Sequence, residues 1–181
     1  MEKRSLFSRI FGNDDDTKAP TTATSFKLLD TYRSIFTRYK GDFEEDVLVR
    51  ACVDAIARNG AKMHPKHIRD REGKFEIVND TLYKILSKKP NELQNAFQFY
   101  YQVISDLELY NNSYIYIQRD ENFKVTGLYP LPYKSITLYE LDGNIYIQFK
   151  FGNSKERFVA YNNCIHLTRF VGKDGLYGGS V

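Results

Sequence analysis

The sequence lacks several features that mark particular classes of protein. Its 181 residues include only two cysteines, too few for a disulfide framework or a structural zinc site. No apolar run approaches the roughly 18 residues that span a bilayer. The net charge is only +3, from 26 basic and 23 acidic residues, so charge alone does not indicate nucleic-acid binding. These absences favour a reducing, cytosolic environment.

Motifs that carry catalytic chemistry are also missing. There is no glycine-rich phosphate loop followed by a helix, no GxSxG nucleophile elbow and no HExxH zinc motif. His64 and His67 are three residues apart, but Pro65 lies between them and disfavours a helical metal pair. His166 alternates with apolar neighbours, which is typical of a hydrogen-bonded strand histidine. The sequence therefore predicts no enzyme: no catalytic residues, no metal and no cofactor.

What is present is enough apolar and aromatic material for one folded domain. Hydrophobic residues make up 42% of the chain and aromatic residues 15%, with 14 tyrosines and 13 phenylalanines. The first residues differ, because a polar stretch follows Phe11 and cannot order itself by burial. We predict a flexible N-terminal arm over residues 1–25 and one folded domain over residues 26–181.

The first predicted helix covers residues 43–59. Asp42 and Glu45 form a capping box at its start, and an Asn-Gly pair ends it. Its apolar stripe, at helical spacing, consists of Val47, Leu48, Ala51, Cys52, Ala55 and Ile56. Cys52 falls on this stripe, so the sequence predicts a small buried hydrophobe there rather than a nucleophile.

Two further helices are predicted before the chain turns to strands. Asn79 or Asp80 caps a short helix, which a following proline prevents from continuing. Asn95 with Gln98 repeats the capping-box pattern and begins a helix near 96–109.

The rest of the chain alternates apolar and polar residues and turns at short intervals, as strands do. An Asp-Gly pair at 142–143 is a strong hairpin signal because both residues tolerate positive φ. Strands are predicted over 113–119, 125–129, 136–141, 144–151, 157–161 and 165–170. The fold class is therefore α+β, with N-terminal helices packed on a mostly antiparallel, hairpin-rich sheet.

A basic cluster coincides with another predicted hairpin, formed by residues 61–69 and 74–78. Its members are Lys62, Lys66, Arg69, Arg71 and Lys74. Such clusters neutralise phosphates, so one hypothesis is a nucleic-acid-binding adaptor domain that uses this hairpin without catalysis. Acidic residues interleave with the basic ones, however, and this pattern favours an ordinary solvated face.

Seven segments, in order, resemble a known family. They are LFSRIFG (6–12), VRACVDAIARNGAKM (49–63), NDTLYKILSKKPNELQNAFQF (79–99), YNNSYIYI (110–117), LYPLPYKSITL (128–138), NNCIHLTRF (162–170) and KDGLYGGSV (173–181). Together they resemble the N-terminal half of tailed-bacteriophage portal proteins, the head-to-tail connectors. No single segment is highly specific, and the resemblance comes from their order and spacing.

This resemblance implies a structural subunit of a portal ring, typically twelvefold, through which double-stranded DNA is packaged into and ejected from the capsid. The implied partners are other portal subunits, the terminase motor, capsid and connector proteins, and the passing DNA, with no membrane. The implied locations are the capsid vertex of the virion and, during assembly, the cytoplasm of the infected bacterium. The resemblance covers the wing region only, so stem and clip are expected beyond Val181.

Tyrosines on the predicted strands are candidates for contacts between ring subunits. Tyrosine offers a large contact area at modest cost in conformational entropy. The candidates are Tyr114, Tyr116, Tyr139 and Tyr146. The alternative is that these tyrosines form the solvent-facing side of a sheet.

Overall fold

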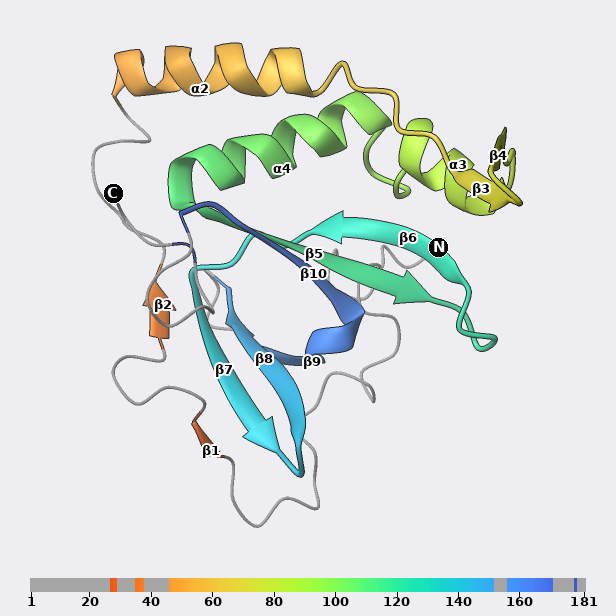
Figure 1. Ribbon diagram of the computed structural model, residues 1–181. Coiled ribbons are helices and arrows are strands. Elements are labelled where there is room, and N and C mark those ends of the chain that lie inside the picture. Colours follow the sequence, from red (N-terminus) through yellow and green to blue (C-terminus); the bar gives the residue numbers. More distant parts are fainter. Residues whose placement is uncertain (1–26, 29–34, 38–45, 152–155, 171–177, 179–181) are drawn as a thin grey trace, which may run out of the picture.

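The computed structural model describes residues 27–28, 35–37, 46–151, 156–170 and 178 (Figure 1). The predicted arm over residues 1–25 lies outside this part of the chain, as do LFSRIFG and most of KDGLYGGSV. Within the described residues, helices form one side of the molecule and two larger sheets lie beneath them (Figure 1). The predicted α+β class with antiparallel strands is confirmed.

The described helices are α2 (Val47–Gly60), α3 (Thr81–Ser87) and α4 (Ala96–Tyr110). Helix α2 begins later than predicted. The side chain of Asp46 caps it by accepting hydrogen bonds from the backbone N–H groups of Leu48 and Val49, while the predicted cap Asp42 lies outside the described residues. The predicted start was wrong because both aspartates precede the apolar residues at a plausible spacing, so the sequence does not choose between them.

The capping box predicted for α4 is confirmed. The Asn95 side chain accepts from the backbone N–H of Gln98, whose side chain accepts from the backbone N–H of Asn95. At the other end of the helix, Asn111 adopts a left-handed conformation with φ of 54° and turns the chain into the next strand. Asp80 caps α3 by accepting from the N–H of Tyr83.

Within the described residues, all strand pairs are antiparallel, and they form three sheets rather than one. The largest contains β1 (Lys27–Leu28), β2 (Ile35–Thr37), β7 (Ser135–Leu141), β8 (Asn144–Lys150) and β9 (Glu156–Ala160). The second contains β10 (Cys164–Thr168), β5 (Asn112–Arg119) and β6 (Val125–Pro130), and the third β3 (Ile68–Arg71) and β4 (Lys74–Ile77). The predicted β7–β8 turn at Asp142-Gly143 is confirmed, with φ of 50° and 75°.

The predicted strand over residues 61–69 is wrong in its first part. Residues 61–67 are not strand, because the backbone N–H groups of Ala61 and Met63 still bond to carbonyl groups of the last turn of α2. Pro65 then offers no N–H to a neighbouring strand. The hairpin therefore starts only at Ile68.

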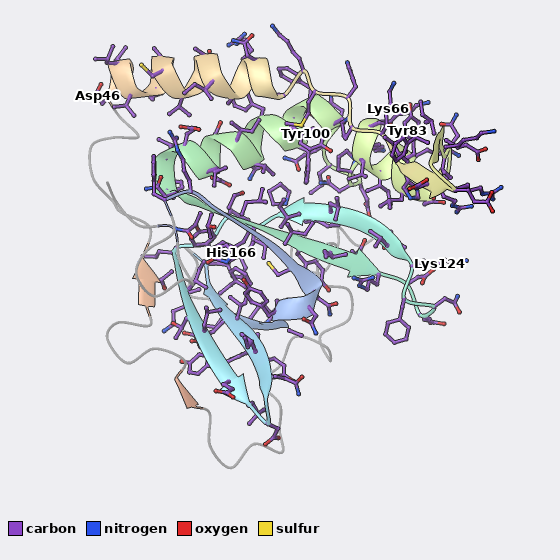
Figure 2. All side chains as sticks on the ribbon, in the orientation of Figure 1. Asp46, Lys66, Tyr83, Tyr100, Lys124 and His166 are labelled. Carbon is purple, nitrogen blue, oxygen red and sulfur yellow. The ribbon has the colours of Figure 1, made fainter. Side chains whose placement is uncertain are left out.

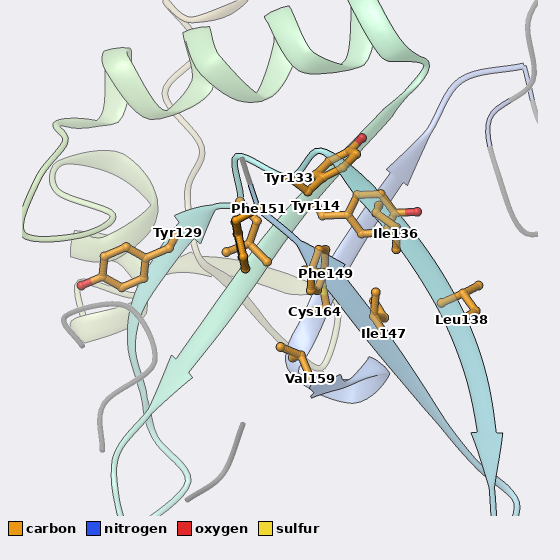
Figure 3. Packing of buried hydrophobic residues seen from close by; sticks show 11 residues of the cluster. Tyr114, Tyr129, Tyr133, Ile136, Leu138, Ile147, Phe149, Phe151, Val159 and Cys164 are labelled. Carbon is orange, nitrogen blue, oxygen red and sulfur yellow. The ribbon is translucent and has the colours of Figure 1, made fainter. Parts of the chain in front are cut away.

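The main core lies between the two larger sheets (Figure 3). Strands β7 and β8 alternate, so one face of each presents apolar side chains to β5 and β10. Tyr114 of β5 meets the rings of Tyr133 and Phe149 edge-on, with centroids 5.3 and 5.6 Å apart. Each such side chain contributes about 1.5–3 kcal/mol by burial. The sandwich is therefore well filled.

A second cluster joins the three-stranded sheet to the helices. Ile115, next to Tyr114 on β5, faces the opposite way and packs with Ile85, Phe99 and Val103 of α3 and α4. The three-stranded sheet is thus buried on both faces, by α3 and α4 on one side and by the larger sheet on the other. Helix α2 packs on α4, farther from the sheets (Figure 1).

Helix α2 does not bury its predicted apolar stripe. Val47 and Leu48 are 80% and 74% exposed, and Cys52 is also exposed, so the prediction of a buried Cys52 is wrong. The helix contacts α4 along another arc, on which Ala57 is fully buried. Apolar residues surround most of this helix, and periodicity alone does not say which arc meets a partner.

Candidate assembly surfaces

The β3–β4 hairpin has one charged and one apolar face. Ile68 pairs directly with Ile77, and Asp70 with Phe75, so these four side chains share a face. Phe75 is 76% exposed, and both isoleucines are more than half exposed. We call Ile68, Phe75 and Ile77 the hairpin face. The alternation of charged and apolar residues in KFEI (74–77) was the sequence signal for this apolar face. The prediction from the sequence used only the basic residues, which lie on the opposite face.

The five predicted basic residues are all exposed, but only three of them are on strands. Arg69, Arg71 and Lys74 share the charged face of the hairpin with Glu76, which is paired with Arg69. Lys62 lies at the end of α2 and donates a hydrogen bond to Asn59, while Lys66 belongs to the intervening loop. The structure brings three of the five together, and phosphate binding by them remains a prediction.

The exposed residues of α2 form a second apolar surface. At 100° per residue, they span about half of the helix circumference. We call this set the α2 face: Val47, Leu48, Ala51, Cys52, Ala55 and Ile56. Apolar patches of this kind mark sites of contact with another protein or surface.

A groove continues this surface between α2 and α4. It has a volume of about 750 Å³, and its lining includes Val47 and Ala51 of α2 and Leu109 of α4. Two of its lining residues are linked, because the Tyr101 hydroxyl group donates to Asp54 at 2.9 Å. This hydrogen bond and those from Arg58 lower the pKa of the Asp54 carboxyl group.

The four candidate tyrosines do not form one surface. Tyr114 is only 1% exposed and stacks on His166 with centroids 4.0 Å apart, so its side chain belongs to the core. Its prediction as a subunit contact is therefore wrong. Strand alternation placed it on a face, but a second sheet covers that face, which the pattern on one strand cannot reveal.

The other three tyrosines are partly exposed. Tyr139 and Tyr146 are cross-strand partners on β7 and β8, and the Tyr139 hydroxyl group donates to Gln148 at 3.2 Å. Tyr116 and Tyr146 both line a cavity of about 310 Å³, together with Arg119 and residues of β9. Their role in subunit contacts stays a prediction.

His67 has a structural connection. Its Nδ1 atom lies 2.9 Å from Asp80 Oδ2, which ties the loop after α2 to the cap of α3. The pKa of Asp80 is lowered, first by the backbone N–H of Tyr83 and then by His67. His64 is exposed. Among the described residues, no group of three or more His, Cys, Asp or Glu side chains is placed to hold a metal ion.

His166 is hydrogen-bonded between β5 and the 3₁₀ turn of Tyr161–Asn163, as the sequence predicted (Figure 2). Asn112 Oδ1 accepts from the backbone N–H of Gly178 and lies 3.0 Å from His166 Nε2. Because that oxygen only accepts, Nε2 carries the proton and Nδ1 accepts from the Tyr161 hydroxyl group. Burial lowers the pKa of His166 to about 4. The neutral ring therefore holds the strands together and is not poised for proton transfer.

Asn112 is the member of this network that the sequence did not reveal. It is fully buried, donates to the carbonyl groups of Tyr110 and Gly178, and so connects the end of α4 to residue 178. Only glycine fits at 178, since a Cβ atom there would collide with the Asn111 carbonyl oxygen. The signal for Asn112 was the Asn-Asn pair, which by itself indicates only a helix end.

The two cysteines have opposite environments. Burial raises the pKa of the Cys164 thiol to about 12, so this residue is an unreactive part of the core. Cys52 is exposed on the α2 face. Both cysteines lie within the described residues, so Cys52 is the one accessible thiol of the chain, and apolar residues of the α2 face surround it.

A filled α+β core that carries two exposed apolar surfaces is typical of a domain that contacts other protein chains. The comparison with protein families gives the particular group. The phage portal protein family matches residues 48–181, which is most of the chain, and the protein belongs to this family. The family is structural.

Individual relatives extend this result. An uncharacterised protein of Rickettsia bellii (strain RML369-C) is 32% identical over 109 residues, which are 60% of this chain and 27% of that protein. One of Rickettsia felis (strain ATCC VR-1525 / URRWXCal2) is 24% identical over 143 residues, or 75% of this chain and 36% of that protein. The match thus spans about a third of the length of these relatives.

A solved structure shares the fold. It is a chain from the neck of an empty GTA particle computed with C6 symmetry, with a TM-score of 0.61 and 17% sequence identity. The likeness covers 86% of this chain and 42% of that chain. Separately, none of the helices in the described part of the chain combines the length and apolar character needed to cross a bilayer.

Proposed function

We propose that this chain is a structural subunit of a phage portal ring through which double-stranded DNA is packaged into a capsid and later ejected. The observation that carries the proposal is the family match over residues 48–181. The fold likeness to a particle neck supports it independently of sequence identity. The domain over residues 26–181 serves as the wing part of the subunit.

The surfaces of the molecule fit such a role. A ring is built from heterologous contacts, in which two different patches of each subunit meet and the rotation closes. The α2 face and the hairpin face are two different exposed apolar patches. DNA must also slide through the channel, so a nearly neutral subunit, with net charge +3, suits a wall that does not grip phosphates strongly.

The partners follow from the ring. We propose copies of the subunit as neighbours, typically twelve, with the terminase motor, capsid and connector proteins docking on the ring. A twelvefold ring contains the sixfold symmetry with which the neck of the GTA particle was computed. The proposed locations are the capsid vertex and, before that, the cytoplasm of the infected cell.

Electron microscopy of the product of the complete reading frame tests this function. Negative-stain images should show rings with a central hole. Monomers that persist under all packaging-like conditions would overturn the proposal. The chain of residues 1–181 alone is expected to associate only weakly, and light scattering that reports a stable dodecamer of it would contradict this.

A second candidate is a nucleic-acid-binding adaptor, and the convergence of Arg69, Arg71 and Lys74 on one hairpin face favours it. Filter binding to duplex DNA over a salt series decides between the two. An adaptor requires affinity that falls steeply as salt rises. Absence of binding below roughly 0.1 M salt, or a flat salt response, removes this candidate.

A further inference from the structure

We infer that the hairpin face of one subunit docks on the α2 face of the next copy, so that these two surfaces form a head-to-tail contact in the assembly. This contact would join neighbouring subunits of the proposed ring, so the inference rests on the proposed function. The occupant of the α2 face is thus a second copy of this chain.

The β3–β4 hairpin has an exposed apolar face that another protein surface could bury. An isolated two-stranded hairpin is at best marginally stable in water. Every residue of β3 and β4 is exposed, including Phe75 and the Ile68–Ile77 pair. Three large apolar side chains on one side of a two-stranded ribbon thus keep more than half of their surface exposed. Contact with an apolar surface of another chain would bury them together.

The α2 face offers a surface of matching character. None of its six residues is charged, although exposed Arg58 lies on the same half of the helix near its end. Val47, Leu48 and Ile56 supply exposed aliphatic area beside the groove to Leu109. A helix of 14 residues is about 21 Å long. Four-residue strands span about 13 Å, so the hairpin fits along this helix.

Charges at the two surfaces are complementary. Asp70 is paired with Phe75 and so lies on the hairpin face side, and the turn of this hairpin carries Glu72. On α2, exposed Arg50 lines the groove at the edge of the α2 face. A docked hairpin can therefore place a carboxylate near Arg50 while Phe75 covers apolar area.

The two surfaces lie at opposite ends of the helical layer, and this arrangement selects a head-to-tail contact. Asp46 marks the start of α2 at one end, whereas Lys66 and Tyr83, near the hairpin, lie at the other (Figure 2). Pairing of two α2 faces would close a two-fold dimer and leave both hairpins uncovered. Pairing of hairpin face with α2 face covers both surfaces of every copy and continues around a ring.

Thiol cross-linking of the full 181-residue chain tests this contact, and it also captures weak association. Cys52 already supplies one accessible thiol on the α2 face, while Cys164 is buried. Phe75→Cys adds a thiol to the hairpin face at a position that is too exposed to disturb folding. With a short bismaleimide, this variant should give a ladder of dimers, trimers and larger species, with Cys52 joined to residue 75 in the linked peptides.

Two controls make the result unambiguous. The unaltered chain, with its thiol on the α2 face, and the double variant F75C/C52S, with its thiol on the hairpin face, should both stay largely monomeric. Dimers of the unaltered chain would mean that α2 faces pair with each other, and would overturn the inference. Ile68→Cys keeps the Phe75 ring and places a thiol on the same face of the hairpin. Absence of a ladder from both Phe75→Cys and Ile68→Cys would overturn the inference as well.

Charge exchange provides a second test with the same readout. In the Phe75→Cys background, Arg50→Glu should lower the ladder yield roughly 1.5- to fivefold, the range for one exposed ion pair. Adding Asp70→Lys should restore the yield. A yield that stays low after the exchange would contradict the pairing of Arg50 with Asp70 and with it the proposed register.

Two further outcomes separate the possible failures. If removal of residues 1–25 speeds maleimide labelling of Cys52 in the dilute monomer, the chain's own N-terminal segment covers the α2 face, and the inference is wrong. If microscopy of the complete product shows rings but the cross-link is absent, the contact fails and the portal function stands. If the ladder forms but the complete product shows no rings under any condition, the contact stands and the portal function fails.

Discussion

The sheet sandwich and the helix–hairpin layer use their apolar residues in opposite ways. In the sandwich, Ile136, Ile147 and Phe149 are completely buried, and aromatic rings meet edge-on at its centre. In the outer layer, Leu48 and Phe75 point into solvent, although the same residue types are used. Folding of the single chain explains the first region but leaves the second unexplained. The proposed contact between chains would account for this difference.

The largest expected effect comes from a substitution that opens a cavity in the sheet sandwich. Phe149→Ala should lower the free energy of unfolding by about 3–5 kcal/mol, because a fully buried ring that contacts Tyr114 and Tyr133 is lost. Urea denaturation followed by circular dichroism measures the change. Phe123→Ala is the matched control, since Phe123 is 81% exposed and should change stability by less than about 0.5 kcal/mol. Equal effects of the two would show that the sandwich is not the stable region.

The buried histidine should make the sandwich sensitive to acid. The pKa of His166 is about 4 in the folded chain, below its ordinary 6.5, so the unfolded chain takes up the proton first as pH falls. Stability from this group is therefore complete above pH 6.5 and is lost between pH 6.5 and 4, by on the order of 3 kcal/mol.

Denaturation of the unaltered chain and of His166→Gln across this pH range measures the effect. Glutamine can donate to Asn112 but does not titrate, so the variant should have the flatter profile. His64 and His67 are present in both chains and cancel in the difference. Parallel profiles for the two chains would contradict the buried, neutral state of His166.

A cap on α4 should have an intermediate effect. Asn95→Ala removes the hydrogen bond to the N–H of Gln98 and should cost about 1 kcal/mol. Asn95→Asp is the conservative control and should keep most of the stability, because the carboxylate accepts the same bond. Thermal unfolding compares the two variants. A loss as large as that of Phe149→Ala would mean that the helical layer is as tightly coupled as the sandwich.

The smallest change in stability is expected on the α2 face. Leu48→Ser should change the unfolding free energy of the monomer by less than about 0.5 kcal/mol, since Leu48 has little contact to lose. Ala57→Ser, on the buried arc of the same helix, should be distinctly more destabilising. Equal losses would show that the α2 face is covered within the monomer, and the contrast between the two regions would disappear.

Local signals predicted much of the fold. The Asn95–Gln98 box, the Asp142-Gly143 turn and the strand alternation are confirmed because each depends on residues close together in the chain. Tyr114 was predicted to lie at a surface but is buried, and Cys52 was predicted to be buried but is exposed. Both predictions were wrong because each depends on which distant element covers the residue. Asn112 was missed for the same reason: its partners at 166 and 178 are distant in the sequence, with separations of 54 and 66 positions.

The candidate surfaces show the same limit. The positions of Arg69, Arg71 and Lys74 were predicted as a cluster, and they share one hairpin face. The hairpin face was not predicted, although Phe75 and Ile77 alternate with charges. Alternation normally implies a buried side, and only the structure shows that this side is open.

Assembly of a portal ring through the open outer layer is tested most directly by electron microscopy of the complete product, unaltered and with Leu48→Ser combined with Phe75→Ser. The unaltered protein should form rings with a central hole, and the double variant should remain folded but appear as separate subunits. Unaltered protein that never forms rings, or a double variant whose rings are as abundant as those of the unaltered protein, would contradict this mode of assembly.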